Sequence, residues 1–361
     1  QSGNTGGMTW AEIGGGVDSD SDKNTVAGTN AGDSISNGEY NTVFGYDAGT
    51  ALTSGDRNTA FGANALKTED TDNNNTAIGF DALATANGAE DNTAVGAYAL
   101  KGLTTGNRNI SIGVWAGDSI TTASDNIAIG VEALQTNDSG ASNVAIGSYA
   151  LNNSNSGNNV AVGGDALKTC TSGYFNVAVG RYALEDLSDA TNCVAVGYNA
   201  AKNATGATNT AIGGAALSAC TTGEQNTCIG YGSGDNITTG ENNTVIGRSA
   251  DASAADVDNE ITLGNTNITK FRIPGVGFVL KDNGGTPSDG QVLTADGSGE
   301  ASWEAASGPG TGESYIKLKS DGSASNSGTS TYAGYQAANN NGGDYNVAIG
   351  MQAFYTADTG A

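Results

Sequence analysis

The sequence has 361 residues, with 56 glycines, 3 prolines and no histidine, and its 38 acidic and 14 basic residues give a net charge of −24. Such a negative surface repels phosphate backbones and anionic lipid, so we expect no nucleic-acid partner. No apolar run reaches the length of a membrane span, so we also expect no direct membrane insertion. Without histidine, Ser-His and Cys-His nucleophile systems and histidine metal sites are excluded, and we expect no enzyme activity, no metal and no cofactor.

Residues 1–23 are polar and rich in glycine. We expect them to be the end of a preceding connector and a cap, in which Trp10 covers the first coil of a solenoid, because an uncovered solenoid end invites edge pairing. A similar Trp-Glu-Gly pattern returns at Trp303, so we expect the sequence to be a segment of a longer chain.

Residues 24–268 repeat one phrase of the form N-T-A-I-G-x-x-A-L. Its glycine recurs in fifteen copies, at twelve intervals of 17 residues and two of 16. A repeat this short cannot bury its own apolar side chains, so each copy must stack on the last. The sequence therefore predicts an all-β fold, a parallel β-solenoid with 17-residue coils. The repeated glycines are Gly28, Gly45, Gly62, Gly79, Gly96, Gly113, Gly130, Gly147, Gly163, Gly180, Gly197, Gly213, Gly230, Gly247 and Gly264.

The three residues before each repeated glycine form the predicted strand. The first is β-branched in all fifteen copies, the third is apolar, and the one between them is usually alanine. Alternate residues share one face of a strand, so we expect the first and third to fill the interior of the coil. The alanines then face outward and let three rods pack about a common axis, although the two faces could exchange these roles. The alanine row includes Ala77, Ala94, Ala128 and Ala145.

Two further positions have a structural interpretation. Asparagine opens thirteen of the fifteen copies, and stacked amides can hydrogen-bond along a ladder, here at Asn58, Asn75, Asn92, Asn126 and Asn143. Glycine closes the strand at a corner that needs positive φ or close backbone approach, as at Gly62, Gly79, Gly96, Gly130 and Gly147. A second short strand is predicted around the alanine three residues after the glycine, which leucine often follows.

The period stops after residue 268. Residues 269–308 combine alternating apolar residues with glycine and proline turns, which predicts a small β connector domain. Residues 309–330 are a Gly/Ser linker, and residues 331–361 restart the repeat at Gly334 and Gly350 as a second array.

Several patterns have both a functional and a structural interpretation. Residues 68–75 and 255–260 are rich in oxygen ligands but match no calcium loop, so we read them as solvated turns. Glu69, Asp70 and Asp72 lack the apolar surroundings that a carboxylate pair of a glycosidase needs.

The four cysteines are interpreted as small buried residues rather than metal ligands. Aromatic residues after the glycine corner could stack on sugars, but we favour a role in shielding corners between neighbouring chains; they are Tyr46, Tyr98, Trp115, Tyr149, Tyr182, Tyr198 and Tyr231.

A ladder of threonines at the first strand position raises the possibility of an ice-binding face. Threonine occupies that position in only eight of fifteen copies and alternates with Ile and Val. We read this exchange as the mark of a buried face and do not favour ice binding.

The runs NTAIGFDAL, NVAIGSYAL and NVAVGRYAL resemble the head repeats of trimeric autotransporter adhesins, which form left-handed parallel β-rolls. The Ala-Leu variant with its longer period looks more like bacteriophage tail fibres. The runs ITKFRIPGVGF and GQVLTADGSGEASW also resemble connector segments of such fibres. The resemblance covers residues 24–268, resumes near the C-terminus, and implies a homotrimer whose chains are intertwined or packed.

The leading hypothesis is therefore the shaft of a phage tail fibre, which spaces and presents a host-receptor-binding tip. Its expected partners are other virion tail proteins and, through a tip outside this segment, a host cell-surface glycan or protein. The expected location is the virion tail, at an extracellular surface. The alternatives are a bacterial surface adhesin of the trimeric autotransporter type and a polysaccharide-degrading tail spike. The sequence identifies no receptor-binding residue.

Overall fold

The structure is a computed structural model that describes residues 18–19, 23–68, 70–273, 278–281, 291–295, 300–305, 330–333 and 346–349. This part of the chain contains strands and turns and no helix. The chain divides into two units, Gln1–Asn267 and Ile268–Ala361. Trp10, which we expected in a cap, and all but the last residue of the expected linker lie outside the described residues.

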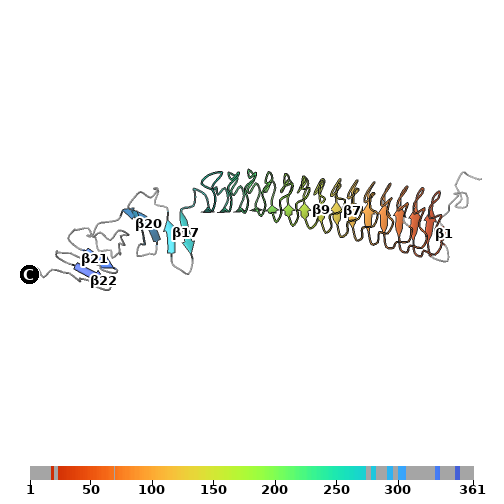
Figure 1. Cartoon of the computed structure of the whole chain (residues 1–361), viewed down its shortest axis with the longest axis horizontal. Helices are drawn as coiled ribbons and strands as arrows, with labels where there is room; N and C mark the ends of the chain where they lie inside the picture. The colour runs from red at the N-terminus through yellow and green to blue at the C-terminus, as the bar shows by residue number, and fades with distance from the viewer. Residues whose placement is uncertain are drawn as a thin grey trace, which may run out of the picture. The chain divides into compact units, whose positions relative to one another are not determined.

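The first unit is a parallel β-solenoid, as predicted, and Figure 1 shows its coils side by side with one short strand in each. Fifteen strands pair in parallel in chain order, and β1 pairs antiparallel with β2. The strands are β1 (Asp18–Ser19), β2 (Thr25–Ala27), β3 (Thr42–Phe44), β4 (Thr59–Phe61), β5 (Thr76–Ile78), β6 (Thr93–Val95), β7 (Ile110–Ile112), β8 (Ile127–Ile129), β9 (Val144–Ile146), β10 (Val160–Val162), β11 (Val177–Val179), β12 (Val194–Val196), β13 (Thr210–Ile212), β14 (Thr227–Ile229), β15 (Thr244–Ile246) and β16 (Ile261–Leu263).

The second unit contains a mixed four-stranded sheet in the order β17-β18-β20-β19 and a separate parallel pair, β21 and β22. In that pair Ser330 lies opposite Asn346, so the offset of 16 residues equals that of the two short coils of the array. The strands are β17 (Lys270–Ile273), β18 (Phe278–Lys281), β19 (Gln291–Ala295), β20 (Glu300–Ala305), β21 (Ser330–Ala333) and β22 (Asn346–Ile349).

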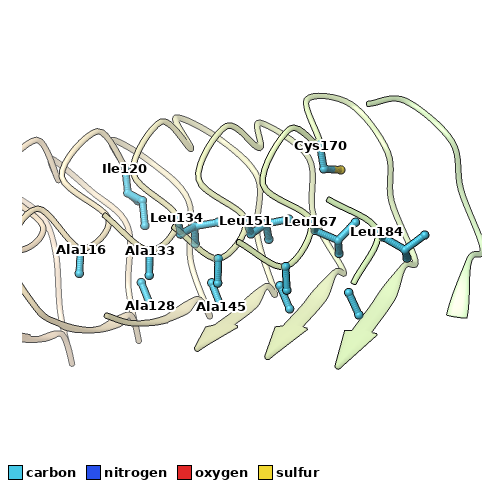
Figure 2. Packing of buried hydrophobic residues seen from close by; sticks show 14 of the residues in the cluster. Ala116, Ile120, Ala128, Ala133, Leu134, Ala145, Leu151, Leu167, Cys170 and Leu184 are labelled. Carbon is cyan, nitrogen blue, oxygen red and sulfur yellow. The ribbon is translucent and has the colours of Figure 1, made fainter. Parts of the chain in front are cut away.

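The expected assignment of the two strand faces is wrong, because the middle residue of each strand points into the coil. Ala128 and Ala145 pair across β8 and β9 and are fully buried, whereas Ile146 beside Ala145 is 37% exposed. Figure 2 shows both alanines inside the coils, with Leu134 and Leu151 above them. The interior is narrow, so only a small residue fits between the strand and the leucines. The other alanines of the row, Ala77 and Ala94, are buried in the same way.

The predicted second strand is absent from each described coil. The alanine three residues after the glycine is buried, but the residues on either side of it have positive φ, for example 55° at Asp81 and 49° at Leu83 around Ala82. Two left-handed residues turn the chain and cannot continue a pleated strand. Coils are still joined here, since the N–H of Leu83 donates to the carbonyl of Ala99 at 3.0 Å.

The asparagine that opens thirteen of the fifteen copies is buried and joins three segments of chain. The backbone N–H of Asn75 donates to Oδ1 of Asn58 at 2.9 Å, and Asn75 Oδ1 accepts from the backbone N–H of Asn92 at 3.0 Å. The Nδ2 group of Asn75 donates to the carbonyl of Ala89 in the following turn at 2.6 Å. Asn126 and Asn143 continue this side-chain-to-backbone ladder, which satisfies the buried amide at each coil.

The corner glycines meet both requirements that we expected of them. Gly62, Gly79 and Gly96 have φ between 134° and 141°, a region that L side chains rarely adopt. A Cβ on Gly62 would also lie 2.4 Å from the carbonyl oxygen of Gly79 in the next coil. Gly130 and Gly147 have φ of 134° and 132°.

Inside each coil, the middle residue of the strand and the residue four after the glycine compensate each other in volume. Where the strand carries alanine, as at Ala178, the second position is usually leucine, here Leu184. Where it carries Val26, Val43, Ser111 or Cys228, the second position is glycine; the last two coils, with Val245 and Thr262, depart from this pattern. A Cβ on Gly49 would lie 3.3 Å from Val43 Cγ1, and one on Gly234 would lie 2.4 Å from Cys228 Sγ.

The two 16-residue coils omit one residue in the turn that precedes the next asparagine. Asn143 Nδ2 donates to the carbonyl of Ser156, 13 residues on, where a 17-residue coil uses the residue 14 on. The strands keep their register, with Ala145 opposite Ala161. The turn therefore absorbs the change in length.

The volume compensation predicts strong coupling between Ala178 and Leu184. We expect Ala178→Val to cost about 1–3 kcal/mol by overpacking and Leu184→Gly about 2–5 kcal/mol by leaving a cavity. The double variant should lose less stability than the sum, by about 0.5–3 kcal/mol, because it reproduces the Val43 and Gly49 arrangement. Urea unfolding measures the cycle. Ala178→Val combined with Leu134→Gly, three coils away, is the control and should be additive.

The asparagine ladder predicts a stabilising substitution at Cys193. Its thiol donates to the carbonyl of Gly206 at 3.5 Å, but it offers no oxygen to the backbone N–H of Asn209. We expect Cys193→Asn to raise the free energy of unfolding by about 1 kcal/mol, the usual net value of one hydrogen bond. The midpoint of thermal unfolding checks this. Cys193→Ala, which adds no acceptor, should give no gain, and equal gains from both variants would contradict the ladder.

Candidate assembly face

The candidate functional surface is the outward side of the solenoid sheet, which we call the strand face and define as the first and third residues of β2 to β16. The third residues are exposed or half-buried in every strand from β3 to β16, and the first residues are half-buried or exposed throughout. Ile112 is 40% exposed and Ile212 also 40%, which shows that the row stays open along the array.

The strand face carries no charged residue, although the chain as a whole has a net charge of −24. Its third row is aliphatic or aromatic from Phe44 to Leu263. Isolated apolar residues on a surface are ordinary, but a continuous apolar stripe is typical of an interaction surface. The stripe is a result of local structure, because every strand has the same three-residue alternation and the same register as its neighbours.

The composition of the strand face varies along the array. The first row is threonine in β2 to β6, aliphatic in β7 to β12, and threonine again in β13 to β15. The third row contains two aromatic residues, Phe44 and Phe61, near its beginning. Their rings stack with centroids 5.1 Å apart and planes 10° from parallel, and their residues are 45% and 52% exposed.

The corner aromatics separate into two groups. Tyr98 and Trp115 lie two residues after their glycines with positive φ, and their rings are nearly parallel with centroids 5.9 Å apart. The Lys101 ammonium lies 4.9 Å from the centre of the Tyr98 ring, so a cation covers this corner. Tyr149 and Tyr182 contact Lys168 and Lys202 in the same way.

The second group lies one residue after the glycine and is more exposed. It consists of Tyr46, Tyr198 and Tyr231, which are 58%, 59% and 62% exposed. These residues lie in the turn that follows the strand, and their expected role in shielding corners between chains stays a prediction.

The acid-rich turns use their carboxylates to join coils. Asp70 accepts from the Thr53 hydroxyl, and Asp72 accepts from the backbone N–H groups of Gly88 and Ala89. Asp258 accepts from the N–H of Glu241 at 2.8 Å in the second acid-rich turn. Glu69 lies outside the described residues. Among the residues that the structure describes, no group of three His, Cys, Asp or Glu side chains could hold a metal ion.

The four cysteines are fully buried free thiols, as expected. Burial raises the pKa of Cys170 and Cys220 to about 11 and the pKa of Cys228 to about 12, each from 9.0. A thiol that stays neutral at physiological pH is a poor nucleophile and a poor metal ligand. These residues therefore belong to the core.

The raised thiol pKa values predict a loss of stability in alkali. Below pH 9 the thiols are neutral in the folded and in the unfolded chain, so they contribute fully to the free energy of unfolding. Above pH 9 the thiols of the unfolded chain ionise, while Cys228 in the folded chain stays neutral up to about pH 12. Stability should fall by up to about 1.4 kcal/mol per pH unit for each thiol in that interval. Urea midpoints at pH 8 to 11 measure this fall. Cys228→Ala should fall less steeply, and an equal slope would contradict the assignment.

The expectation that the threonine row is buried is wrong, because the row lies on the exposed strand face and not in the core. Thr42 is exposed and Thr59 is half-buried. Burial therefore gives no reason to set ice binding aside. The third row, however, is aliphatic or aromatic from Phe44 onward and carries no hydroxyl group. A face with a continuous apolar row is better suited to another protein surface.

A comparison of the chain with protein-family models, with curated proteins and with solved structures finds no match to any of them. Within the described residues, the structure also has no helix with the length and apolar character to cross a membrane.

Proposed function

We propose that this chain is a segment of a fibre shaft that self-associates through its strand faces as a parallel homotrimer and holds a receptor-binding tip away from its point of attachment. The observation that supports this most directly is the uncharged apolar stripe, which runs from β3 to β16 on an otherwise strongly acidic chain. We propose a phage tail fibre as the particle to which the shaft belongs, with the virion tail as its location.

A second copy of the chain is the partner whose surface fits the stripe. The exposed side chains recur once per coil, about every 4.8 Å, as in any parallel sheet. Only a surface with the same axial repeat can place its own side chains between those of the stripe at every coil. A second copy has that repeat because it has the same sequence. Homo-oligomers of this kind usually have closed symmetry, and three rods around one axis must then be parallel.

The number three is supported by the resemblance to head repeats and fibres that are trimeric. The alanine row does not support it, because it lies inside the coil. The proposal therefore moves the interface to the first and third strand positions. A left-handed coil and a connector role for the sheet of β17 to β20 are part of the same proposal. Other tail proteins and a host glycan or protein receptor remain the proposed partners of the complete fibre.

Two alternatives predict different observations. A bacterial surface adhesin would carry a C-terminal membrane β-barrel in its full-length chain, whereas a tail fibre would be encoded beside baseplate or tail genes. A polysaccharide-degrading spike would release new reducing ends from host polysaccharide. We expect no such release from this segment, because carboxylates of the acid-rich turns already bind backbone or hydroxyl groups.

The proposed interface is tested by Ile146→Glu. Ile146 is 37% exposed in the middle of the strand face, so the variant should fold, but association would bring three carboxylates together away from water. Leaving such charges unpaired costs several kcal/mol, so we expect a monomer or a much weaker trimer by light scattering. Asn153→Glu, on an exposed turn of the same coil, is the matched control and should stay trimeric.

A monomeric mass for the unmodified chain, or a trimer unaffected by Ile146→Glu, would refute the proposed interface. Ala145→Glu cannot serve as this test. Ala145 is fully buried inside the coil, so a glutamate there should disrupt folding whether or not the chains associate.

A further inference from the structure

The strand face creates a problem of alignment for any two copies that pack through it. From Ile78 to Ile246 the third row contains only Ile and Val, which differ by one methylene group. If one copy slides along another by a single coil, each Ile or Val meets another Ile or Val, and only the contacts of one terminal coil are lost. The aliphatic part of the face therefore distinguishes poorly between registers one coil apart.

We propose that Phe44 and Phe61 set the axial register in which copies of this chain associate. The inference rests on the self-association under the proposed function and adds the residues that would specify it. Phe44 and Phe61 are the only aromatic residues on the strand face of the fifteen copies. Both are exposed in the single chain, so their rings are available to a neighbouring copy.

The third-row residues before and after the phenylalanine pair make a slipped register sterically unfavourable. Ala27 precedes it in β2 and is only 7% exposed, and Ile78 follows it in β5. In register, copies place rings beside rings at two successive levels, and the chains can keep equal distances from the axis. A slip of one coil still places Phe61 of one copy beside Phe44 of the other, but it also places Phe44 beside Ala27 and Phe61 beside Ile78. The first of these levels is left with a void, and the second must admit a ring where the in-register interface holds only isoleucine. Voids and overpacking are both costly in a packed interface.

The other changes in residue type along the strand face distinguish less well between axial registers. The first row changes from Thr93 to Ile110 and from Val194 back to Thr210. Threonine and valine have nearly the same shape, and isoleucine adds one methylene group, so a slip at these boundaries changes the packed volume far less than the exchange of a phenylalanine ring for Ala27. The phenylalanine pair is the feature that gives a slipped register a different volume.

The test uses the complete 361-residue chain and cysteines introduced on the strand face at Val179 and Val196, which lie opposite each other in β11 and β12 and are both 37% exposed. One tagged copy carries Val179→Cys, and a copy with a different tag carries Val196→Cys; the two are produced together and oxidised. A disulfide needs Cα atoms within about 7 Å, so like cysteines join best in register and unlike cysteines join best after a slip of one coil. The native thiols are buried and should not react.

In the unmodified background we expect cross-links mainly between like cysteines. In the Phe44→Ile and Phe61→Ile double variant, the chain should remain trimeric while cross-links between unlike cysteines rise to a share comparable with those between like ones. Phe80→Ile is the matched control, because Phe80 is equally exposed but lies in the turn after β5; its pattern should not change.

Any other outcome contradicts either the register role of the two phenylalanines or the proposed self-association. A double variant that keeps the pattern of the unmodified chain overturns the role of the two phenylalanines in register. A double variant that becomes monomeric also overturns it, since the rings would then drive association itself. An unmodified chain that is monomeric, or that forms no cross-link at all, refutes the proposed self-association and is thereby distinguished from failure of the register role.

Discussion

The hydrogen bonds of the buried asparagine are the constraint on which the array depends. Each amide binds the backbone of the next coil through its oxygen, and all but that of Asn126 bind the following turn through the nitrogen, as Asn75 does with Asn92 and Ala89. A buried amide without these partners would be costly, so the position of one coil fixes the next. Strands of three residues would pair only weakly by themselves. The asparagine hydrogen bonds hold neighbouring coils in place, so the strands keep their register from β2 to β16. The continuous strand face is a result of that register.

The sequence was sufficient to predict the solenoid, its period, the in-register strands and the positive φ of the corner glycines. It was not sufficient to decide which strand face is inside, because an alternation identifies two faces without saying which one is buried. Hydrophobicity alone favoured Ile and Val for the interior. The deciding signal was present as a correlation between two positions: Val43 accompanies Gly49, whereas Ala178 accompanies Leu184. Residues that exchange volume in this way must share one enclosed space.

The error about the second strand has a different cause. The Ala-Leu pair looks like part of a strand, yet Leu83 and its equivalents adopt left-handed backbone conformations that leucine rarely adopts. Hydrogen bonds to the next coil and burial of the leucine side chain hold them there. Such a conformation depends on neighbouring coils, so local propensity could not predict it. The exposed strand face was missed for a related reason, since the apolar residues that form it had been assigned to the core.

The equivalence of the coil interfaces has a consequence for how such a chain can change in length. Apart from the copies that open with Cys193 and Glu260, the coils present the same hydrogen-bonding groups above and below, so removing one whole repeat joins two surfaces that already fit. Unequal recombination between repeated gene segments can therefore shorten or lengthen the rod in steps of about 4.8 Å without a new packing problem. The two 16-residue coils carry their single-residue deletion in the turn, where the strand register is not affected. The array is in this sense built from interchangeable coils, and its length can evolve without a change in the structure of each coil.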